Sequence, residues 1–192
     1  HNRILEECSK DGKHYVYAYY EEPDSTMHDY GTDHIKSNKV INKINKLTEE
    51  LCSKLDEDTV VIVTADHGHL NCEDILLSDY EDLYNTLDGD VWIEGRMCSF
   101  KVKEGMHDTF VKLFNEYFGK EFILKSKKEI IDEKLFGTGE EHKLFRDSLG
   151  DYFGLAISDK FFKYSVYSTD LVSMHAGFTE DEMRIPLIVI SK

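Results

Sequence analysis

Three short stretches of the sequence combine aspartate, histidine and glycine at spacings suited to holding a metal ion. The first is PDSTMHDYG, in which His28 follows Asp24 by four residues and Gly31 lets the chain turn back. A carboxylate oxygen and an imidazole nitrogen at this spacing can share one divalent cation. Pro23 fixes its own φ and favours an extended residue before it. We therefore expect Asp24 at the carboxyl end of a strand, where ligands bind in open α/β sheets.

The second stretch is TADHGH, which ends the apolar run 59–65. Successive side chains of a strand point to opposite faces, so Asp66 and His67 can face one ion only where the strand has ended. Gly68 permits that break. We predict Asp66 and His67 as metal ligands, and His69 as a group that lies behind the ligands or at the surface.

The third stretch is STDLVSMHAGFTEDEMRIP, residues 168–186. In it His175 precedes the small pair Ala176 and Gly177, and Pro186 opens a final apolar run. A single histidine before a small residue is often only part of a loop, so His175 gains its weight from the other two stretches. Each of the three lies beside a predicted strand end, and this favours one shared site.

Apolar patterns predict the elements that would bring these stretches together. HYVYAYYE, residues 14–21, is rich in aromatic and β-branched residues and is typical of a strand. Residues 33–55 have the apolar spacing of a helix. The continuous apolar runs 59–65 and 185–191 are typical of strands buried on both faces. Strand, helix and strand in this order predict a βαβ unit in a parallel sheet.

The middle of the chain has a different pattern. It predicts a helix over 73–87, a strand over 96–103, a helix over 107–119, a helix over 126–137 that opens with a Ser126–Glu129 capping box, and a hairpin of strands at 153–158 and 162–167. Within one domain that spans residues 1–192, we predict that residues 90–167 form a small α+β insertion.

The composition limits the partners of the chain. Its 192 residues contain 23 Lys and Arg against 38 Asp and Glu, a formal net charge of −15. Such a surface repels nucleic acid and anionic membranes, and it repels an anionic substrate unless a bound cation reverses the local field. No apolar run is long enough to span a membrane. Four dispersed cysteines suit a reducing compartment, so we expect a cytoplasmic protein.

Together, PDSTMHDYG, TADHG and HAGFTEDEMRIP resemble the alkaline phosphatase superfamily, and within it the type I phosphodiesterase/nucleotide pyrophosphatase branch. They follow one another in the family's order, although Met27 stands where the family motif usually has glycine. The resemblance implies a three-layer α/β/α sandwich, here partial, that holds two divalent ions, commonly zinc.

The resemblance also implies the ligands and the reaction. Asp24, His28 and His175 would bind one ion, and Asp66 and His67 would bind the other. The two cations would offset the charge of a phosphate ester and lower the pKa of a nucleophilic hydroxyl. We therefore expect a metal-dependent hydrolase of phosphate esters whose small substrate is a phosphodiester or a nucleotide.

In the family, a threonine or serine nucleophile and a further aspartate precede the P-D motif. The residues before Asp24 contain no threonine, and Ser9 follows no buried strand. The sequence, which opens at His1, therefore predicts the C-terminal part of a catalytic domain, inactive by itself, that pairs with the missing N-terminal part or self-associates. A phosphomonoesterase or sulfatase of the same superfamily is the alternative enzyme. A non-catalytic zinc-binding domain is the alternative of another class.

Overall fold

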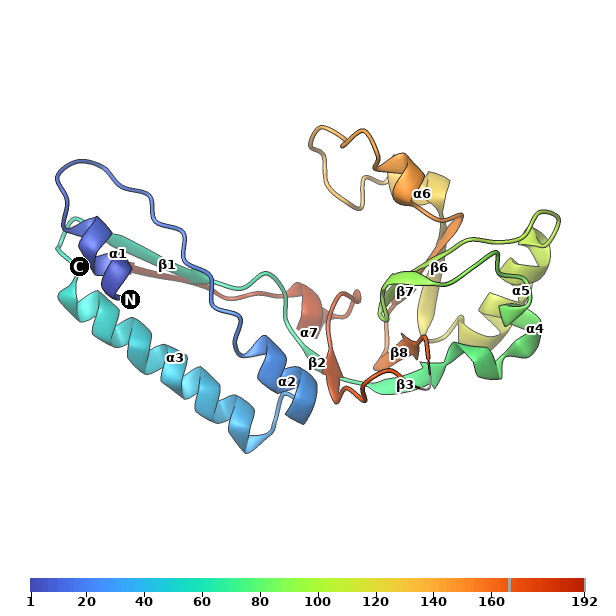
Figure 1. The fold of residues 1–192 in the computed structure, drawn as a ribbon, viewed down its shortest axis with the longest axis horizontal. Helices are drawn as coiled ribbons and strands as arrows, with labels where there is room; N and C mark the ends of the chain where they lie inside the picture. Colours follow the sequence, from blue (N-terminus) through green and yellow to red (C-terminus); the bar gives the residue numbers. More distant parts are fainter. Residues whose placement is uncertain (166, 192) are drawn as a thin grey trace.

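The computed structural model describes residues 1–165 and 167–191, and its fold is mixed α/β (Figure 1). The helices are α1 (Asn2–Cys8), α2 (Asp24–Tyr30), α3 (Ile35–Lys54), α4 (Glu81–Tyr84), α5 (His107–Phe118), α6 (Lys127–Asp132) and α7 (Glu180–Met183), with the 3-10 helices η1 (Leu77–Asp79) and η2 (Arg146–Ser148). The strands are β1 (Val60–Thr64), β2 (Leu70–Asn71), β3 (Glu73–Leu76), β4 (Trp92–Glu94), β5 (Met97–Phe100), β6 (Phe122–Ser126), β7 (Tyr152–Ala156), β8 (Lys160–Lys163), β9 (Ser173–Met174) and β10 (Leu187–Ser191).

These elements form two lobes (Figure 1). The terminal lobe contains α1, α3, β1, β10 and both ends of the chain, and β1 pairs antiparallel with β10 from Val60 opposite Ser191 to Thr64 opposite Leu187. The sheet lobe contains the antiparallel sheet β4-β5-β7-β6 and the parallel pair of β3 and β8. The antiparallel pair of β2 and β9 lies between the lobes, beside α2. None of the helices in the described residues is long and apolar enough to cross a membrane.

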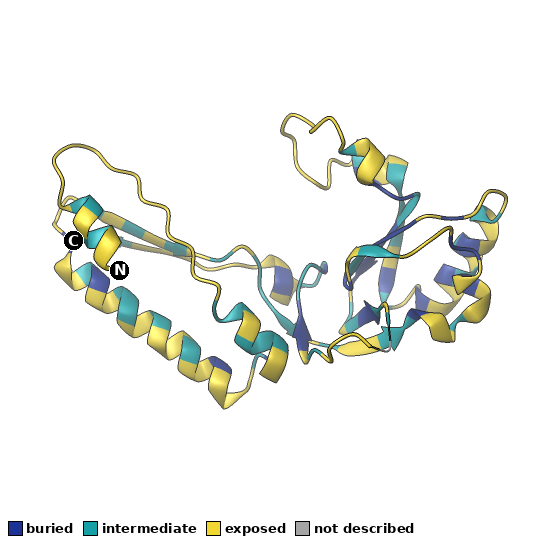
Figure 2. Cartoon of the chain, in the orientation of Figure 1, coloured by how far each residue is buried: buried dark blue, intermediate teal, exposed yellow. Residues whose placement is uncertain are grey.

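The main apolar core lies in the sheet lobe (Figure 2). α5 carries phenylalanine at every fourth position, and Phe110, Phe114 and Phe118 are each at most 1% exposed. Their rings meet those of Phe100 in β5 and Phe162 in β8 in tilted and edge-to-face contacts. Burying one such side chain contributes about 1.5–3 kcal/mol. The phenylalanine spacing therefore explains why the predicted helix forms here and which face it buries.

Several predicted elements are confirmed. α3 lies within the helix predicted over 33–55, and α5 and β5 also lie within their predicted ranges. α6 opens with the predicted capping box, in which the Ser126 hydroxyl accepts from the Glu129 N–H and the Glu129 carboxylate accepts from the Ser126 N–H. Local signals of this kind act within one or two turns, so distant contacts do not alter them.

The segment 14–21 is not the strand that its composition predicted. It has no strand partner among the residues that the structure describes, and in Figure 1 it passes from α1 to α2 without joining a sheet. Tyr15 and Tyr17 are 91% and 75% exposed. Aromatic and β-branched residues favour a strand only where a neighbouring strand supplies packing. The βαβ unit is therefore wrong for the described residues.

β1 and β10 are strands, as predicted, but they are not buried on both faces. They pair antiparallel rather than in a parallel sheet. Val61 and Ile190 are half-buried and lie beside the end of α3, whereas Ile62 and Val189 are 61% and 59% exposed. Alternate side chains of a strand point to opposite faces. One face of this pair is therefore covered and the other is open to solvent.

Two predictions in the sheet lobe are wrong. Residues 73–87 are not one helix, because β3, η1 and α4 follow one another there and β3 pairs with β8. The strands predicted at 153–158 and 162–167 form as β7 and β8, but they are not a hairpin, since β7 lies between β5 and β6. Residue 166 of the second strand lies outside the described residues. The boundaries 90–167 of an insertion stay a prediction.

A fully buried ion pair connects the sheet lobe to α7. Arg96, in the turn between β4 and β5, is 0% exposed and Glu182 in α7 is 2% exposed. The guanidinium donates to both carboxylate oxygens and to the carbonyl oxygens of Ser158 and Lys160, at 2.8 and 2.7 Å. One side chain thereby holds three segments that are distant in the sequence.

Further donors keep Glu182 ionised. Burial by itself raises the pKa of this carboxyl, but hydrogen bonds from Arg96, Thr179 and Gly177 outweigh burial, so the pKa lies below its ordinary value of 4.5. A carboxyl with a lowered pKa in the folded state stabilises the fold above its unfolded pKa, and that stabilisation is lost as pH falls through the folded value. The ion pair is therefore fully formed at neutral pH.

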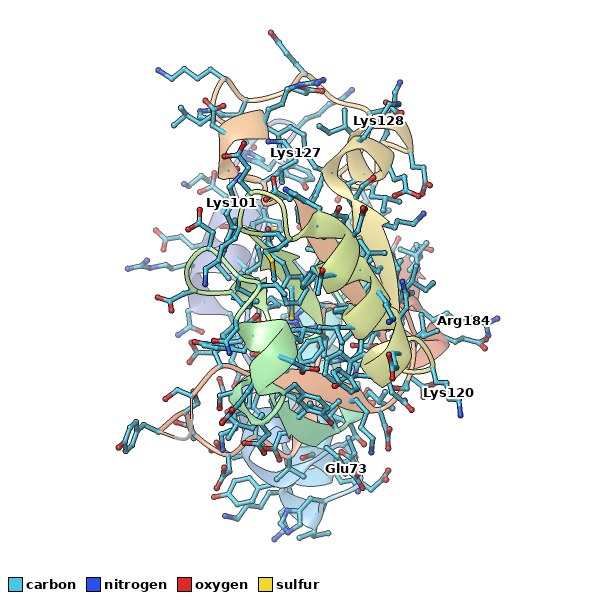
Figure 3. All side chains as sticks on the ribbon, turned by 90° about the vertical axis from the view of Figure 1, so that its right-hand side faces the viewer. Glu73, Lys101, Lys120, Lys127, Lys128 and Arg184 are labelled. Atoms are coloured by element: carbon cyan, nitrogen blue, oxygen red, sulfur yellow. The ribbon has the colours of Figure 1, made fainter. Side chains whose placement is uncertain are left out.

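Replacing Glu182→Gln leaves a buried guanidinium without its counter-charge. We expect the free energy of unfolding, measured by urea denaturation at pH 7, to fall by about 3–5 kcal/mol. Glu180→Gln is the matched control, because Glu180 lies in the same helix and pairs with Arg184, which points into solvent (Figure 3). An exposed pair contributes about 0–1 kcal/mol. Equal losses in the two variants would contradict the importance of the buried pair.

Candidate metal centre

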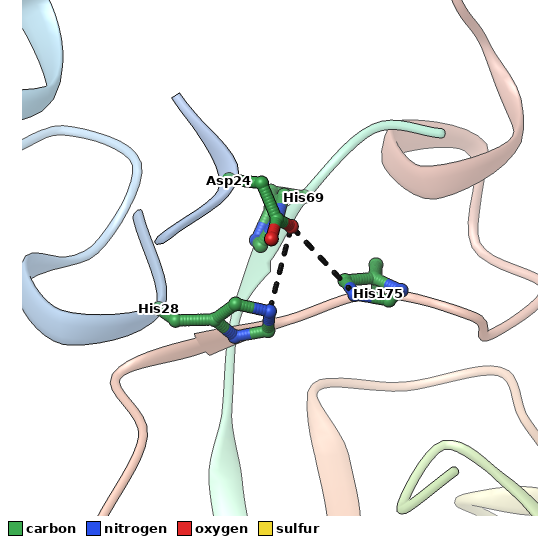
Figure 4. A group of neighbouring side chains, drawn as sticks. All are labelled: Asp24, His28, His69 and His175. Carbon is green, nitrogen blue, oxygen red and sulfur yellow. Dashed lines mark hydrogen bonds and ion pairs between the residues drawn. The ribbon is translucent and has the colours of Figure 1, made fainter. Parts of the chain in front are cut away.

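Four side chains from three separate segments meet between the two lobes (Figure 4). Asp24 and His28 come from α2, His69 precedes β2 and His175 follows β9. One ligand atom from each of the four lies within 4.8 Å of the others. The Nε2 atoms of His28, His69 and His175 are 3.4, 2.7 and 3.7 Å from Asp24 Oδ1. We call these four residues the histidine cluster.

Asp24 and His28 are neighbours because they share one helix. The predicted position of Asp24 at the end of a strand is wrong, since Asp24 is the first residue of α2 and directly follows Pro23. Residues four apart in a helix lie on the same face. The spacing of the P-D-x-x-x-H motif therefore brings a carboxylate and an imidazole together through a helical turn.

A backbone carbonyl fixes the orientation of His28. Its Nδ1 lies 2.7 Å from the carbonyl oxygen of Ser173 in β9. A carbonyl oxygen can only accept, so Nδ1 carries the ring proton and Nε2 presents a lone pair toward Asp24. Histidine ligands of metals usually have their second nitrogen held in this way. His28 is thus arranged to bind a cation through Nε2.

His175 follows β9 at a point of unusual backbone geometry. Ala176 has φ +75°, in the left-handed region that residues other than glycine rarely adopt. Burial, with smaller contributions from the imidazoles of His67 and His69, lowers the pKa of His175 to about 4. The ring is therefore neutral at physiological pH, which is the form that binds metal ions.

The donor types of the histidine cluster fit a divalent metal ion. Burial raises the pKa of Asp24, but the hydrogen bond with His69 and the neighbouring imidazoles outweigh burial, and the pKa lies below its ordinary value. Asp24 is therefore an anion at neutral pH. One carboxylate and three imidazoles are ligands that zinc and similar transition metals accept.

Asp66 and His67 lie beside the histidine cluster. The His67 ring stacks on that of His175 with centroids 3.8 Å apart, and its Nε2 is 3.7 Å from Asp66 Oδ1 and 3.9 Å from Asp24 Oδ1. The Asp66 side chain is 65% exposed. The structure thus brings the five ligands expected from the sequence to one place. Their division between two ions stays a prediction.

His69 is placed more deeply than the sequence analysis expected. Its side chain is 5% exposed, and Nδ1 lies 3.0 Å from Ser173 Oγ while Nε2 faces Asp24. We expected a group behind the ligands or at the surface, and the structure puts His69 within the cluster. The H-x-H spacing of His67 and His69 is the signal in the sequence, since alternate residues of an extended chain lie on the same side.

Gly68 allows the loop after β1 to pack directly on α7. Its N–H donates to the carbonyl oxygen of Glu182 at 2.8 Å, and a Cβ at this position would lie 1.9 Å from the carbonyl oxygen of Asp181. The sequence suggested that this glycine ends a strand, whereas the structure shows that it permits close approach of two backbones. Gly177 has a related role, because a Cβ there would lie 2.6 Å from Glu182 Oε2.

Gly68→Ala should therefore separate the loop from α7. We expect the free energy of unfolding to fall by at least about 1–3 kcal/mol, the usual cost of overpacking. Gly139→Ala is the control, because a Cβ there meets no atom within 4 Å; its effect should stay within about 0.5 kcal/mol. Urea denaturation measures both, and equal stability of the two variants would refute the close approach.

The chain matches one protein family in sequence and several solved structures in fold. The family described as type I phosphodiesterase / nucleotide pyrophosphatase matches residues 3–145. No curated protein sequence matches the chain. Among solved structures, an inactive variant of murine ectonucleotide pyrophosphatase/phosphodiesterase 5 in complex with AMP has a TM-score of 0.73 and 21% identity, and the match covers 97% of this chain and 50% of that one. For the human protein of the same name, the TM-score is 0.75, the identity 18% and the coverage 98% and 50%.

A bacterial enzyme has the same fold at lower similarity. Phosphonoacetate hydrolase from Sinorhizobium meliloti 1021, in complex with phosphonoformate, has a TM-score of 0.61 and 18% identity, covering 86% of this chain and 43% of that one.

The chain spans about half the length of the ectonucleotide pyrophosphatase/phosphodiesterases it resembles. The family match includes Asp24, His28 and the D-H-G motif and ends before His175.

Proposed function

Because this chain belongs to the type I phosphodiesterase/nucleotide pyrophosphatase family of the alkaline phosphatase superfamily, we propose that it carries part of the active site of a metal-dependent hydrolase of phosphate esters. The observation that carries the proposal is the meeting of one anionic carboxylate with imidazoles from three chain segments, of which the His175 ring is neutral. A small phosphodiester or nucleotide is the substrate. The structural relatives in complex with AMP and with phosphonoformate support this class of ligand.

The proposed ligands divide between two ions, and zinc is the proposed metal. Asp24, His28 and His175 hold the first, and Asp66 and His67 contribute to the second. When bound, such ions offset the charge of a phosphate ester and lower the pKa of a nucleophilic hydroxyl. The chain's own residues set the geometry: Ser173 orients His28, and α7 holds the loop that carries Asp66 and His67.

The proposal also accounts for the charge of the chain. A net charge of −15 repels an anionic ester at long range. The imidazoles of the cluster add no positive charge when they are neutral, so the attraction must come from bound cations. The metal site is thus both the means of catalysis and the means of attracting the substrate.

Metal content tests the first step of the proposal. Full-length protein purified without chelator should contain zinc or a similar divalent ion, measured by elemental analysis. His28→Ala and His175→Ala should each lower the zinc content, whereas His142→Ala, at an exposed position far along the chain, should not. Absence of metal, with none taken up on dialysis against zinc, would contradict the proposed metal dependence.

Hydrolysis tests the second step. His67→Ala and Asp66→Asn in the full-length protein should reduce turnover of a chromogenic phosphodiester by more than about 100-fold, because the ion near the nucleophile loses a ligand. Circular dichroism should show an unchanged fold. A phosphomonoester and a sulfate ester assayed in parallel distinguish the alternative enzymes, and zinc binding without any turnover would favour a non-catalytic zinc-binding domain.

We further propose that residues 1–192 alone do not turn over substrate. The family resemblance puts the nucleophile ahead of Pro23, and the chain spans about half of its structural relatives. The exposed side chains of β1 and the unpaired segment 14–21 favour association with the rest of the domain or with a second copy.

The cytoplasmic location expected from the cysteines stays a proposal as well.

The isolated chain provides the test. Size-exclusion chromatography should show self-association, and adding the N-terminal part of the domain should give a complex that hydrolyses the phosphodiester. A monomeric chain that turns over substrate without a partner would mean that a nucleophile lies within these residues.

A further inference from the structure

His69 has a different neighbour at each ring nitrogen. Nδ1 lies 3.0 Å from the hydroxyl oxygen of Ser173, and Nε2 lies 2.7 Å from Asp24 Oδ1. Both distances are those of hydrogen bonds. A neutral imidazole has one proton, so it can donate at only one of these nitrogens.

The Ser173 hydroxyl decides which nitrogen carries the proton. Its Oγ also lies 2.7 Å from the carbonyl oxygen of Met27. The carbonyl can only accept, so the single hydroxyl proton of Ser173 is donated to Met27. Ser173 Oγ must then accept from His69, and the ring proton is on Nδ1. Nε2 faces Asp24 Oδ1, and a hydrogen bond between these two atoms needs a second ring proton, on Nε2.

A metal ion that faces both Nε2 of His69 and the Asp24 carboxylate would take the place of that second proton. His28 has the same pattern, because its Nδ1 proton is donated to the Ser173 carbonyl and its Nε2 faces the same Asp24 oxygen. A proton can bridge only one ring nitrogen to Asp24, whereas a metal ion can bind every ring nitrogen that faces it. The donors of a tetrahedral zinc site lie roughly 3.3 Å apart, close to the 3.4 and 3.7 Å that separate Asp24 Oδ1 from Nε2 of His28 and His175. The 2.7 Å from Asp24 Oδ1 to Nε2 of His69 is the length of a hydrogen bond, and it would lengthen when an ion replaced the proton.

We propose that His69 is a fourth protein ligand, through Nε2, of the ion that Asp24, His28 and His175 hold. Ser173 is a positioning residue that orients two ligands at once, His28 through its carbonyl and His69 through its hydroxyl. This inference rests on the proposed metal site and goes beyond it. Catalytic zinc sites commonly have three protein ligands and one open position. In this chain His69 adds a fourth protein ligand, so the ion is held more tightly, and a substrate oxygen would join it as a fifth ligand.

Counting the imidazoles bound to zinc tests the proposal directly. The substitution His67→Ala in the full-length protein removes a proposed ligand of the second ion. Zinc K-edge X-ray absorption of this variant then counts the imidazole ligands of the remaining ion. We expect three, falling to two when His69→Ala is added. His69→Gln gives the same comparison with a side chain closer in size, in case the alanine variant does not fold. His142→Ala should leave the count at three.

Calorimetry of zinc binding provides the second measurement. Adding His69→Ala should raise the Kd by more than about 10-fold. Ser173→Ala should raise it by about 10–100-fold with three imidazoles still bound, because the ligands remain and only their orientation is lost. An unchanged Kd in Ser173→Ala would overturn its positioning role.

The outcomes separate this inference from the proposed function. Tight zinc binding with two imidazoles, unchanged by His69→Ala, would overturn the ligand role of His69 and leave the proposed metal site intact. Failure of the parent protein to bind zinc would overturn both.

Discussion

The buried pair of Arg96 and Glu182 is the contact on which the site depends. A guanidinium and a carboxylate without solvent are costly to bury, and they are tolerated here because each of their polar atoms has at least one hydrogen-bond partner. The pair fixes α7, and α7 in turn receives the N–H of Gly68. The loop with Asp66 and His67 and the loop with His175 therefore both contact Glu182, through the N–H groups of Gly68 and Gly177.

A second set of hydrogen bonds joins α2 to β9. The N–H of Val172 donates to the carbonyl of His28, the His28 ring donates to the carbonyl of Ser173, and the Ser173 hydroxyl donates to the carbonyl of Met27. These bonds join residues about 145 positions apart in the sequence. They determine the tautomer of His28 as well as its position. The same contacts that form the site therefore also prepare the nitrogen that would bind a metal.

The sequence predicted which polar residues gather at one place better than it predicted the sheet. P-D-x-x-x-H, D-H-G and H-A-G depend on local spacing, and the structure brings their polar residues together. The strand expected over 14–21 failed because a strand requires a partner, which composition does not reveal. The sequence does not show that His69 lies within the cluster, because its position depends on a contact with Ser173, a residue that lies 104 positions away. Contacts of that separation leave no periodic signal in the chain.

The position of the cluster between two unequal lobes has an energetic consequence. The sheet lobe has a closed aromatic core, whereas Ile62, Leu187 and Val189 of the terminal lobe are exposed (Figure 2). The segments that carry the ligands are joined mainly by hydrogen bonds and by one ion pair, and each hydrogen bond contributes only about 0.5–1.5 kcal/mol net. An ion that bound the cluster would add its binding free energy to these contacts. Metal binding would therefore be coupled to the alignment of the two lobes, since the same three segments supply both the histidine cluster and the junction.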